Sequence, residues 1–219
     1  LAAALAGSFA STYTGNIVIN DANSASIAAA DISTIAGTTN GTVTVSNDIN
    51  ITGTSAEVAA AVGNVNTFSG SPTAALSTDH TLAELKTINN AFGGTLTLND
   101  YSVALSGSSA DVAAALDGTF AASYTGNAVL NNAHTLAQLK TINNATSGTI
   151  TLNDASVALS GSSADITAAL NGITNYTGNV TLSDAHTLAQ LKAINNAGSG
   201  SITLNDASVA LSGSSADIA

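Results

Sequence analysis

A block of 31 residues occurs twice, almost unchanged, in this chain. The segment from Thr135 to Asp165 reads TLAQLKTINNATSGTITLNDASVALSGSSAD, and the segment from Thr187 to Asp217 repeats it with three changes. A third copy runs from Thr81 to Asp111, and a diverged copy ends at Glu57. Repeats of this kind are typical of arrays in which neighbouring copies bury a common core, because one copy cannot bury its hydrophobic face alone.

The copies set the expected domain organisation. Cutting the chain after each SSAD-type tetrad gives repeats 1–57, 58–111, 112–165 and 166–217, with the start of a fifth at 218–219. We therefore predict a single repeat array over 1–219. The opening LAAALAGSFASTYTGN aligns without a gap on Val112 to Asn127, so the chain begins and ends inside the same element of the repeat. We expect a fragment of a longer chain.

Each copy is predicted to hold two strand and helix pairs. In the shorter half, GNVTLSD from Gly178 alternates apolar and polar residues, which is typical of a strand. Thr187 followed by Gln190 resembles a capping box, and Leu188, Leu191 and Ile194 then form the apolar stripe of a helix. The longer half repeats this pattern with a bent strand and a second helix.

The helix of the longer half is marked by its own cap and stripe. Ser162 and Asp165 form a plausible N-cap pair. Apolar residues follow at helical spacing: Ile166, Ala169, Leu170 and Ile173. Strands that alternate with helices at this spacing run parallel, because each crossover returns the chain to the same edge. The predicted fold class is α/β, a right-handed repeat solenoid of parallel strands alternating with short helices. Whether the strands form one sheet or two stays open.

Composition excludes several functions. The net charge is −11, with 14 acidic residues against three basic ones, so no basic surface exists for nucleic acid. The absence of cysteine excludes disulfides, thiolate metal sites and thiol catalysis. No apolar run approaches the ~18 residues of a membrane span, so we expect none in this segment. Candidate side chains recur in several copies, whereas an enzyme needs one asymmetric site, and we predict no catalytic residues and no enzyme.

Bulky and basic side chains recur at fixed places in the copies. One aromatic residue precedes a strand in each copy, and we interpret these residues as packing anchors: Tyr13, Phe68, Tyr124 and Tyr176. A histidine precedes each of three capping threonines, and a lysine follows six residues later: His80, His134 and His186, with Lys86, Lys140 and Lys192. We expect the imidazoles to hydrogen-bond the backbone at helix starts and the lysines to be solvated. A metal site or a pH switch at the histidines is the alternative.

Aspartates and threonines suggest two further alternatives. Asp100, Asp154 and Asp206 end strands and are weak candidates for calcium, which prefers oxygen ligands. The calcium-binding nonapeptide of solenoids is absent and turn chemistry explains these residues, so we predict no cofactor, with calcium as the alternative. T-x-T pairs at Thr42, Thr95 and Thr149 resemble an ice-binding surface, but other residues interrupt the rows: Val18, Ala75 and Val129. Threonine is also a common outward strand residue.

Three sequence blocks carry a resemblance that covers the whole chain. HTLAQLKAINNA, GSITLNDASVALSGSSADI and YTGNVTLSDA resemble the repeat regions of very large secreted or cell-surface proteins of bacteria, cyanobacteria especially. The resemblance implies an extracellular or cell-surface location and a role in adhesins, surface layers or fibres. We therefore expect a structural repeat protein that forms a filament, sheath or adhesin stalk on a bacterial surface. The alternative is a surface-binding solenoid module for ice, polysaccharide or calcium-dependent adhesion.

The expected partners are copies of the chain itself or further repeats of the same chain. Such contacts would join equivalent positions in register and give a filament, because an open head-to-tail contact does not close. If the contact is noncovalent, apolar residues of one end stack on those of the other: Leu5, Ile17 and Ile19 on Ile202, Leu204 and Leu211. Covalent continuation in one long chain is favoured, since the repeat is cut within a helix.

Overall fold

The computed structural model describes residues 13–218. They fall into two compact units, one of residues 13–103 and 114–123 and the other of residues 104–113 and 124–218. The helix expected at the start of the chain, including Leu1 and Leu5, lies outside the described residues, as does Ala219.

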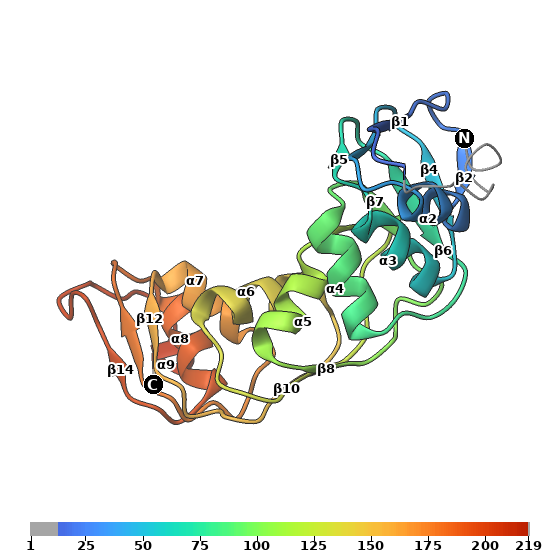
Figure 1. The fold of residues 1–219 in the computed structure, drawn as a ribbon. Helices are drawn as coiled ribbons and strands as arrows, with labels where there is room; N and C mark the ends of the chain where they lie inside the picture. The colour runs from blue at the N-terminus through green and yellow to red at the C-terminus, as the bar shows by residue number, and fades with distance from the viewer. Residues whose placement is uncertain (1–12, 219) are drawn as a thin grey trace. The chain divides into compact units, whose positions relative to one another are not determined.

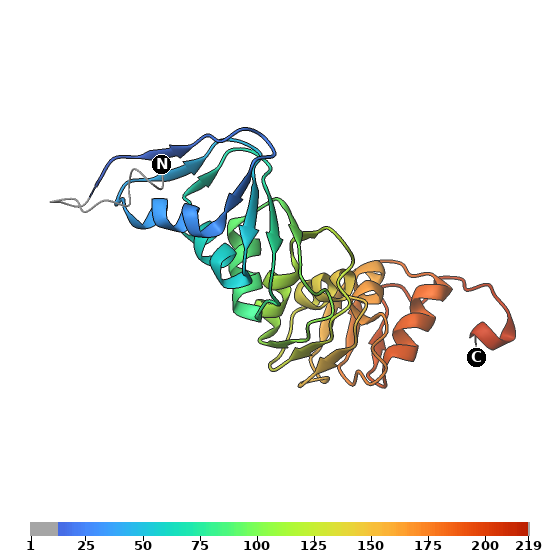
Figure 2. The ribbon, with the colours of Figure 1, turned by 90° about the vertical axis from the view of Figure 1, so that its right-hand side faces the viewer.

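The first unit contains two parallel sheets (Figure 1). Strands β1 (Ile17–Ile19), β3 (Val43–Val45) and β5 (Thr67–Phe68) form one sheet in that order. The second sheet has the order β2, β4, β6, β7 and β9, with bounds Ser26–Ala28, Asn50–Gly53, Thr73–Leu76, Thr95–Thr97 and Thr119–Phe120. Helices α2 (Ala29–Gly37), α3 (Ser55–Gly63) and α4 (Leu82–Ala91) pack on one another in chain order (Figure 2).

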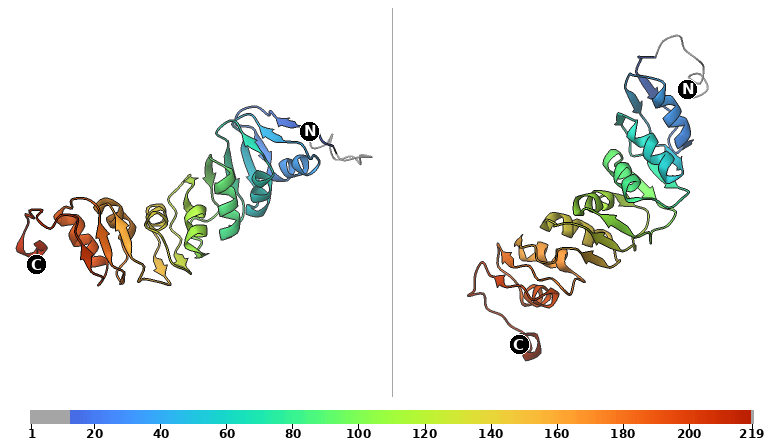
Figure 3. Two further views of the ribbon diagram at one scale, coloured as in Figure 1. Left: turned by 60° about the vertical axis from the view of Figure 1, so that its left-hand side comes forward. Right: turned by 60° about the horizontal axis from the view of Figure 1, so that its bottom comes forward.

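The second unit also contains two parallel sheets. Strands β8 (Leu105–Gly107), β10 (Ala128–Leu130) and β11 (Ile150–Leu152) form the first, with β10 in the middle. Strands β12 (Leu159–Gly161), β13 (Val180–Leu182) and β14 (Ile202–Thr203) form the second. Its helices α6 (Leu136–Ala145), α7 (Ser163–Leu170) and α8 (Leu188–Ala197) lie side by side, and the short helix α9 (Ser215–Ile218) follows after a loop (Figure 3). Helix α5 (Ser109–Leu116) contributes residues to both units.

The fold is therefore α/β with parallel strands, which confirms this part of the predicted class. The sequence left open how the strands join, and the described residues form four sheets. The break between sheets in the second unit lies in the longer half of the repeat. β11 pairs with β10, and β12 pairs with β13, in register Leu159 to Val180. The bent strand predicted there is two strands, and the turn between them moves the chain from one sheet to the next.

Apolar residues from both strands and helices fill the cores. Leu139 and Ile142 on α6, and Ile32 on α2, are completely buried. Of the expected aromatic anchors, Tyr124 and Tyr176 are 1% and 2% exposed, which confirms their packing role. Tyr13 is 42% exposed and forms a bridge with Thr39 beside the edge strand β1.

The fourth anchor, Phe68, is half-buried and makes an edge-to-face contact with Phe92, with ring centroids 5.6 Å apart. Such a contact adds to the burial of both rings. Among the helices of residues 13–218, none combines the length and the apolar character needed to cross a membrane.

Candidate functional site

Capping boxes begin the helices of the shorter halves: α4, α6 and α8. In α8, the Thr187 side chain accepts a hydrogen bond from the Gln190 backbone, and Gln190 Oε1 accepts one from the Thr187 N–H at 2.9 Å. The same reciprocal pairs form in α4 and α6, at Thr81 with Glu84 and at Thr135 with Gln138. These boxes confirm the prediction from sequence, and they satisfy backbone donors that a helix start leaves open.

A buried serine connects each capping box to the preceding helix. Ser163, the first residue of α7, is 2% exposed, and its Oγ lies 3.2 Å from both the Ala185 carbonyl oxygen and Gln190 Oε1. Its backbone N–H donates to Asp184 Oδ1 at 2.7 Å. One hydroxyl and one amide therefore bind the chain segment that leads into the next helix.

The same arrangement occurs at two earlier serines. Ser109 Oγ lies 3.0 Å from the Ala133 carbonyl oxygen and from Gln138 Oε1. Ser55 Oγ lies 2.9 Å from the Asp79 carbonyl oxygen and from Glu84 Oε2. We call each of these clusters a serine junction: Ser55 with Glu84, Ser109 with Gln138 and Ser163 with Gln190. The pattern of residues predicts a cap at Ser162, which the bond from the Asp165 N–H confirms, but it predicts no role for the buried neighbour.

The acidic member of these junctions is held ionised. Partial burial raises the pKa of Glu84, but hydrogen bonds from Thr81 and Ser55 outweigh that effect and keep the pKa below its ordinary value. The glutamine at the equivalent position of α6 and α8 has the same acceptor oxygen without the charge. The junction therefore depends on an oxygen acceptor at this place rather than on an ionisable group.

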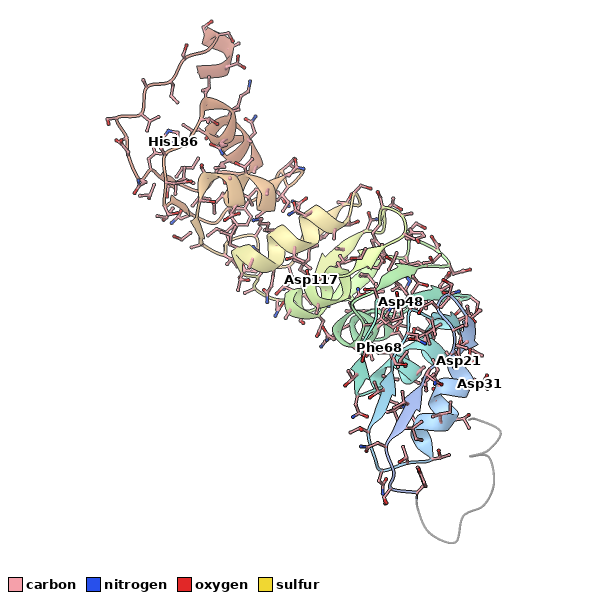
Figure 4. All side chains as sticks on the ribbon, turned by 90° about the horizontal axis from the view of Figure 1, so that it is seen from above. Asp21, Asp31, Asp48, Phe68, Asp117 and His186 are labelled. Carbon is pink, nitrogen blue, oxygen red and sulfur yellow. The ribbon has the colours of Figure 1, made fainter. Side chains whose placement is uncertain are left out.

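The three histidines lie beside the junctions and are buried: His80, His134 and His186 are 3%, 4% and 5% exposed. His134 Nε2 lies 3.4 Å from Tyr176 Oη. The Nδ1 atoms of His134 and His186 are buried and have no hydrogen-bond partner among the described residues, so the expected backbone bond is not made by these atoms. Figure 4 labels His186.

Burial also disfavours the charged form of two of these side chains, His80 and His134. It lowers the pKa of His134 below the ordinary value, against the attraction of the Asp154 carboxylate. It lowers the pKa of His80 in the same way, against three nearby carboxylates. Within residues 13–218, no cluster of three or more histidine, aspartate or glutamate side chains could hold a metal ion.

The weak calcium candidates form local turns. Asp154 Oδ1 accepts hydrogen bonds from the Ser156 N–H at 2.9 Å and from its hydroxyl at 2.6 Å. Asp100 and Asp206 make the same bonds to the serine two residues ahead. These bonds hold the pKa of all three carboxylates below the ordinary value. The three carboxylates lie on separate turns, and each turn uses one oxygen of its aspartate.

Two of the lysines bridge neighbouring helices instead of pointing only to solvent. Lys140 of α6 pairs with Asp165 of α7, and Lys192 of α8 pairs with Asp217 of α9. The four side chains are 40–45% exposed, so each ion pair is screened by water and contributes little to stability. In addition, Asn143 Nδ2 donates to the backbone carbonyl of Ala169 at 2.8 Å.

Threonine, glycine and asparagine fix the turns that lead into the strands. Thr146 Oγ1 donates to the Gly126 carbonyl at 2.7 Å and accepts from the Gly148 N–H at 2.9 Å. A Cβ at Gly148 would lie 2.3 Å from that same carbonyl oxygen, so the close approach requires glycine. Asn127 Oδ1 then accepts from the Thr149 N–H at 2.9 Å. The YTGN motif therefore binds neighbouring turns to one another.

Polar residues line the outward faces of the sheets. In the five-stranded sheet, Asn50 of β4 pairs with Ser26 of β2 on one side and with Thr73 of β6 on the other. Farther along the same sheet, Thr95 of β7 pairs with Thr119 of β9. The neighbouring row of that sheet contains Ala75 between Thr52 and Thr97. Val18 beside Thr44, and Val129 between Ser106 and Thr151, interrupt two other rows. The interruptions predicted from sequence thus lie within the rows.

Comparison with known proteins finds no matching family model, no matching curated protein and no matching solved structure. The geometry of the junctions is accordingly the basis for a functional conclusion.

Proposed function

We propose that this chain is a β/α solenoid that serves as a structural repeat protein. The observation that carries the proposal is the serine junction, which forms at three successive places between equivalent atoms: a serine hydroxyl and a carboxylate or amide oxygen. A repeated junction of this kind gives each copy the same connection to its neighbour, so stability adds up copy by copy along an array. Nothing in this arrangement requires a cofactor or a catalytic group.

The polar side chains support a scaffold rather than a chemical site. The capping threonines, the buried serines, the turn asparagines and the aspartates each bind backbone or side-chain groups of a neighbouring segment. Groups held in this way are unavailable to a substrate without loss of the junction. The chain works as a spacer or stalk, and its partners are copies of itself or further repeats of the same chain.

The sequence resemblance supplies the cellular setting of the proposal. Repeat regions of large secreted bacterial proteins have blocks similar to HTLAQLKAINNA and GSITLNDASVALSGSSADI of this chain. The proposed role is therefore a filament, sheath or adhesin stalk on the outside of a bacterial cell. An acidic, cysteine-free surface suits this location, because it keeps extended chains soluble without disulfides.

Immunogold electron microscopy tests this role. Antibodies raised against the 219-residue chain are applied to intact and to permeabilised cells of the source organism. We expect label on fibrous or sheath material of intact cells, at similar density after permeabilisation. Label confined to permeabilised cells, or to discrete globular particles, would contradict the proposal. Antibodies against an abundant cytosolic protein serve as the control for cell integrity.

A second candidate is binding to a regular polar surface, such as ice or crystalline polysaccharide. The row of Ser26, Asn50 and Thr73 favours it, because register brings these side chains into line on one face of a sheet. However, Thr73 Oγ1 donates to Asn50 Oδ1 at 3.1 Å, so part of the row is bonded to itself. Retention of the purified chain on ice or on insoluble cellulose, lost on changing Thr73 and Thr97 to lysine, would support this candidate over the scaffold.

A further inference from the structure

The histidines occupy the position directly before the N-cap of α6 and α8. Ala133 precedes His134, and its carbonyl oxygen accepts a hydrogen bond from the Ser109 hydroxyl at 3.0 Å. Ala185 precedes His186, and its carbonyl oxygen accepts a hydrogen bond from the Ser163 hydroxyl at 3.2 Å. Each imidazole is thus one residue from a serine junction and is buried beside it. A change in the position of the imidazole would move the carbonyl that the junction uses.

The contacts of His134 fix where its proton lies. Tyr176 Oη donates to the Val157 carbonyl oxygen, so the lone pairs of the phenol are left to accept from His134 Nε2 at 3.4 Å. The neutral tautomer with its proton on Nε2 satisfies this contact and leaves Nδ1 as a bare acceptor. Nδ1 is buried and has no partner among the described residues. The geometry therefore suits a neutral imidazole.

Protonation would place a donor and a charge at Nδ1. Burying an N–H group without an acceptor is costly, and a buried charge without a close partner costs more. The start of α6 lies next to His134, and the exposed N–H groups of a helix start carry partial positive charge that opposes an imidazolium there. Both effects act against the charged form while the junction is closed.

Carboxylates around the histidines act in the opposite direction. Asp154 attracts a proton on His134, Asp206 interacts with His186, and three groups act on His80: Asp79, Glu84 and Asp100. Asp154 and Asp206 are bound in exposed turns, so water screens their attraction. Tyr176 is the other titratable group that faces His134, and burial raises its pKa to about 12, so it stays neutral. For His134, burial outweighs these attractions.

We propose that the histidine before each shorter-half helix is a proton-sensitive lock, which holds the serine junction closed while the imidazole is neutral and opens it on acidification. An imidazolium satisfies its donors by turning out to water, and that turn withdraws the preceding carbonyl from the buried serine. The start of α2 shows that the place also accepts an apolar side chain, because Ile27 stands directly before its N-cap, Ala28. The device goes beyond a purely structural role: it makes the junctions responsive to pH.

Urea unfolding of the 219-residue chain at pH 7.5, 6.5 and 5.0 tests the lock. The three histidines are the only side chains whose ordinary pKa lies in this interval, since cysteine is absent and carboxylates titrate lower. The unfolded chain takes up protons on its imidazoles below about pH 6.5, whereas burial in the folded chain opposes proton uptake at His80 and His134. The folding equilibrium constant should therefore fall by up to about 30-fold per excluded proton between pH 7.5 and 5.0.

A triple variant, His80→Leu with His134→Leu and His186→Leu, provides the matched comparison, with an apolar side chain like that of Ile27. Its folding constant should stay the same across the interval. A wild-type constant that does not change between pH 7.5 and 5.0, or a variant that keeps the wild-type dependence, would overturn the lock.

A second measurement uses only the wild-type chain, so it does not depend on whether the triple variant folds. NMR of the wild-type chain with ¹⁵N-labelled histidine follows each imidazole during acidification. We expect the neutral Nε2–H form of His134 to persist until signals of the opened state appear. An imidazole that titrates at or above pH 6.5 inside the intact fold would overturn the proposal.

Discussion

Helix α2 begins after Ala28, which makes no side-chain cap, whereas α6 begins after Thr135, which forms a complete capping box with Gln138. The residue before the cap differs in the same way, since Ile27 precedes α2 and His134 precedes α6. Both helices nevertheless bury an apolar residue at their fourth position, Ile32 and Leu139 respectively, with no exposure. The starts of α2 and α6 therefore both bury an apolar side chain at the same helical position, and they differ in their polar groups.

This difference distinguishes the buried apolar stripe, which both helices have, from the capping box and the histidine, which only α6 has. Burial of the apolar stripe is common to both helices, so it is sufficient to place a helix on its neighbours. The cap and the histidine are both present at α4, α6 and α8 and both absent at α2, whereas α3 has a capping box at Thr54 without a histidine before it. We infer that they set the stability and the pH response of individual junctions, while the core sets the fold.

The largest effect on stability is expected from substituting the buried apolar residue that both helices have at their fourth position. Ile32→Ala and Leu139→Ala should each lower the free energy of unfolding by about 2–5 kcal/mol, because each leaves a cavity in a fully buried place. Urea denaturation followed by circular dichroism measures both. If Ile32→Ala costs less than about 1 kcal/mol while Leu139→Ala costs the full amount, the two helices do not share a core role.

The serine junction should rank next. Ser163→Ala removes the hydroxyl that lies 3.2 Å from the Ala185 carbonyl oxygen and from Gln190 Oε1. Gln190 Oε1 keeps its hydrogen bond from the Thr187 N–H, so the Ala185 carbonyl oxygen is the acceptor that loses this donor. We expect a loss of about 1–3 kcal/mol in the free energy of unfolding. Ser160→Ala is the matched control on the exposed face of β12 and should change it by less than about 0.5 kcal/mol. Equal losses for the two variants would remove the special role of the buried serine.

Exchanging the caps sharpens the comparison directly. Thr135→Ala should cost about 1 kcal/mol, since it removes the acceptor for the Gln138 N–H. Ala28→Thr should add up to about 1 kcal/mol, because Ala28 already has the extended backbone of an N-cap, φ −67° and ψ 134°. Thermal unfolding of both variants measures these opposite changes. A destabilising Ala28→Thr would mean that the start of α2 cannot accept a side-chain cap.

The smallest effect concerns the aspartate turns. Hydrogen bonds from Ser156 hold the pKa of Asp154 below its ordinary value, so their contribution to stability is present above about pH 4 and is lost as pH falls through the folded-state pKa. Ser156→Ala removes the side-chain bond and should raise the pKa of Asp154 toward that of a free aspartate, as measured by carboxyl NMR titration. The pKa of Asp206, in the equivalent turn, should not move.

Local patterns in the sequence predicted the parts of the structure that depend on neighbours along the chain. The capping box of Thr187 and Gln190 needs only residues three apart, and the stripe on α8 needs only helical spacing. The serine junction could not be found in this way, because Ser163 and Gln190 meet only through the packing of α7 on α8. Its recurrence in three copies was the available signal.

The sheet arrangement and the surroundings of the histidines could not be predicted either, because both depend on tertiary structure. The bent strand of the longer half was expected, but periodicity does not say whether β12 pairs with the neighbours of β11 or starts a new sheet. Likewise, the place of His134 before a helix was visible in the sequence, whereas the contact of Nε2 with Tyr176 Oη, 42 residues ahead, depends on tertiary structure.

Deleting residues 112–165 tests the central claim most directly, because it removes one copy and joins Asp111 to Ile166 in register. If the copies are interchangeable units with equivalent junctions, the shortened chain keeps the same circular dichroism per residue and unfolds cooperatively at a lower urea midpoint. Deleting residues 112–150 instead breaks the register and should prevent cooperative folding. A shortened chain that fails to fold after the in-register deletion would contradict a structure built from equivalent repeats.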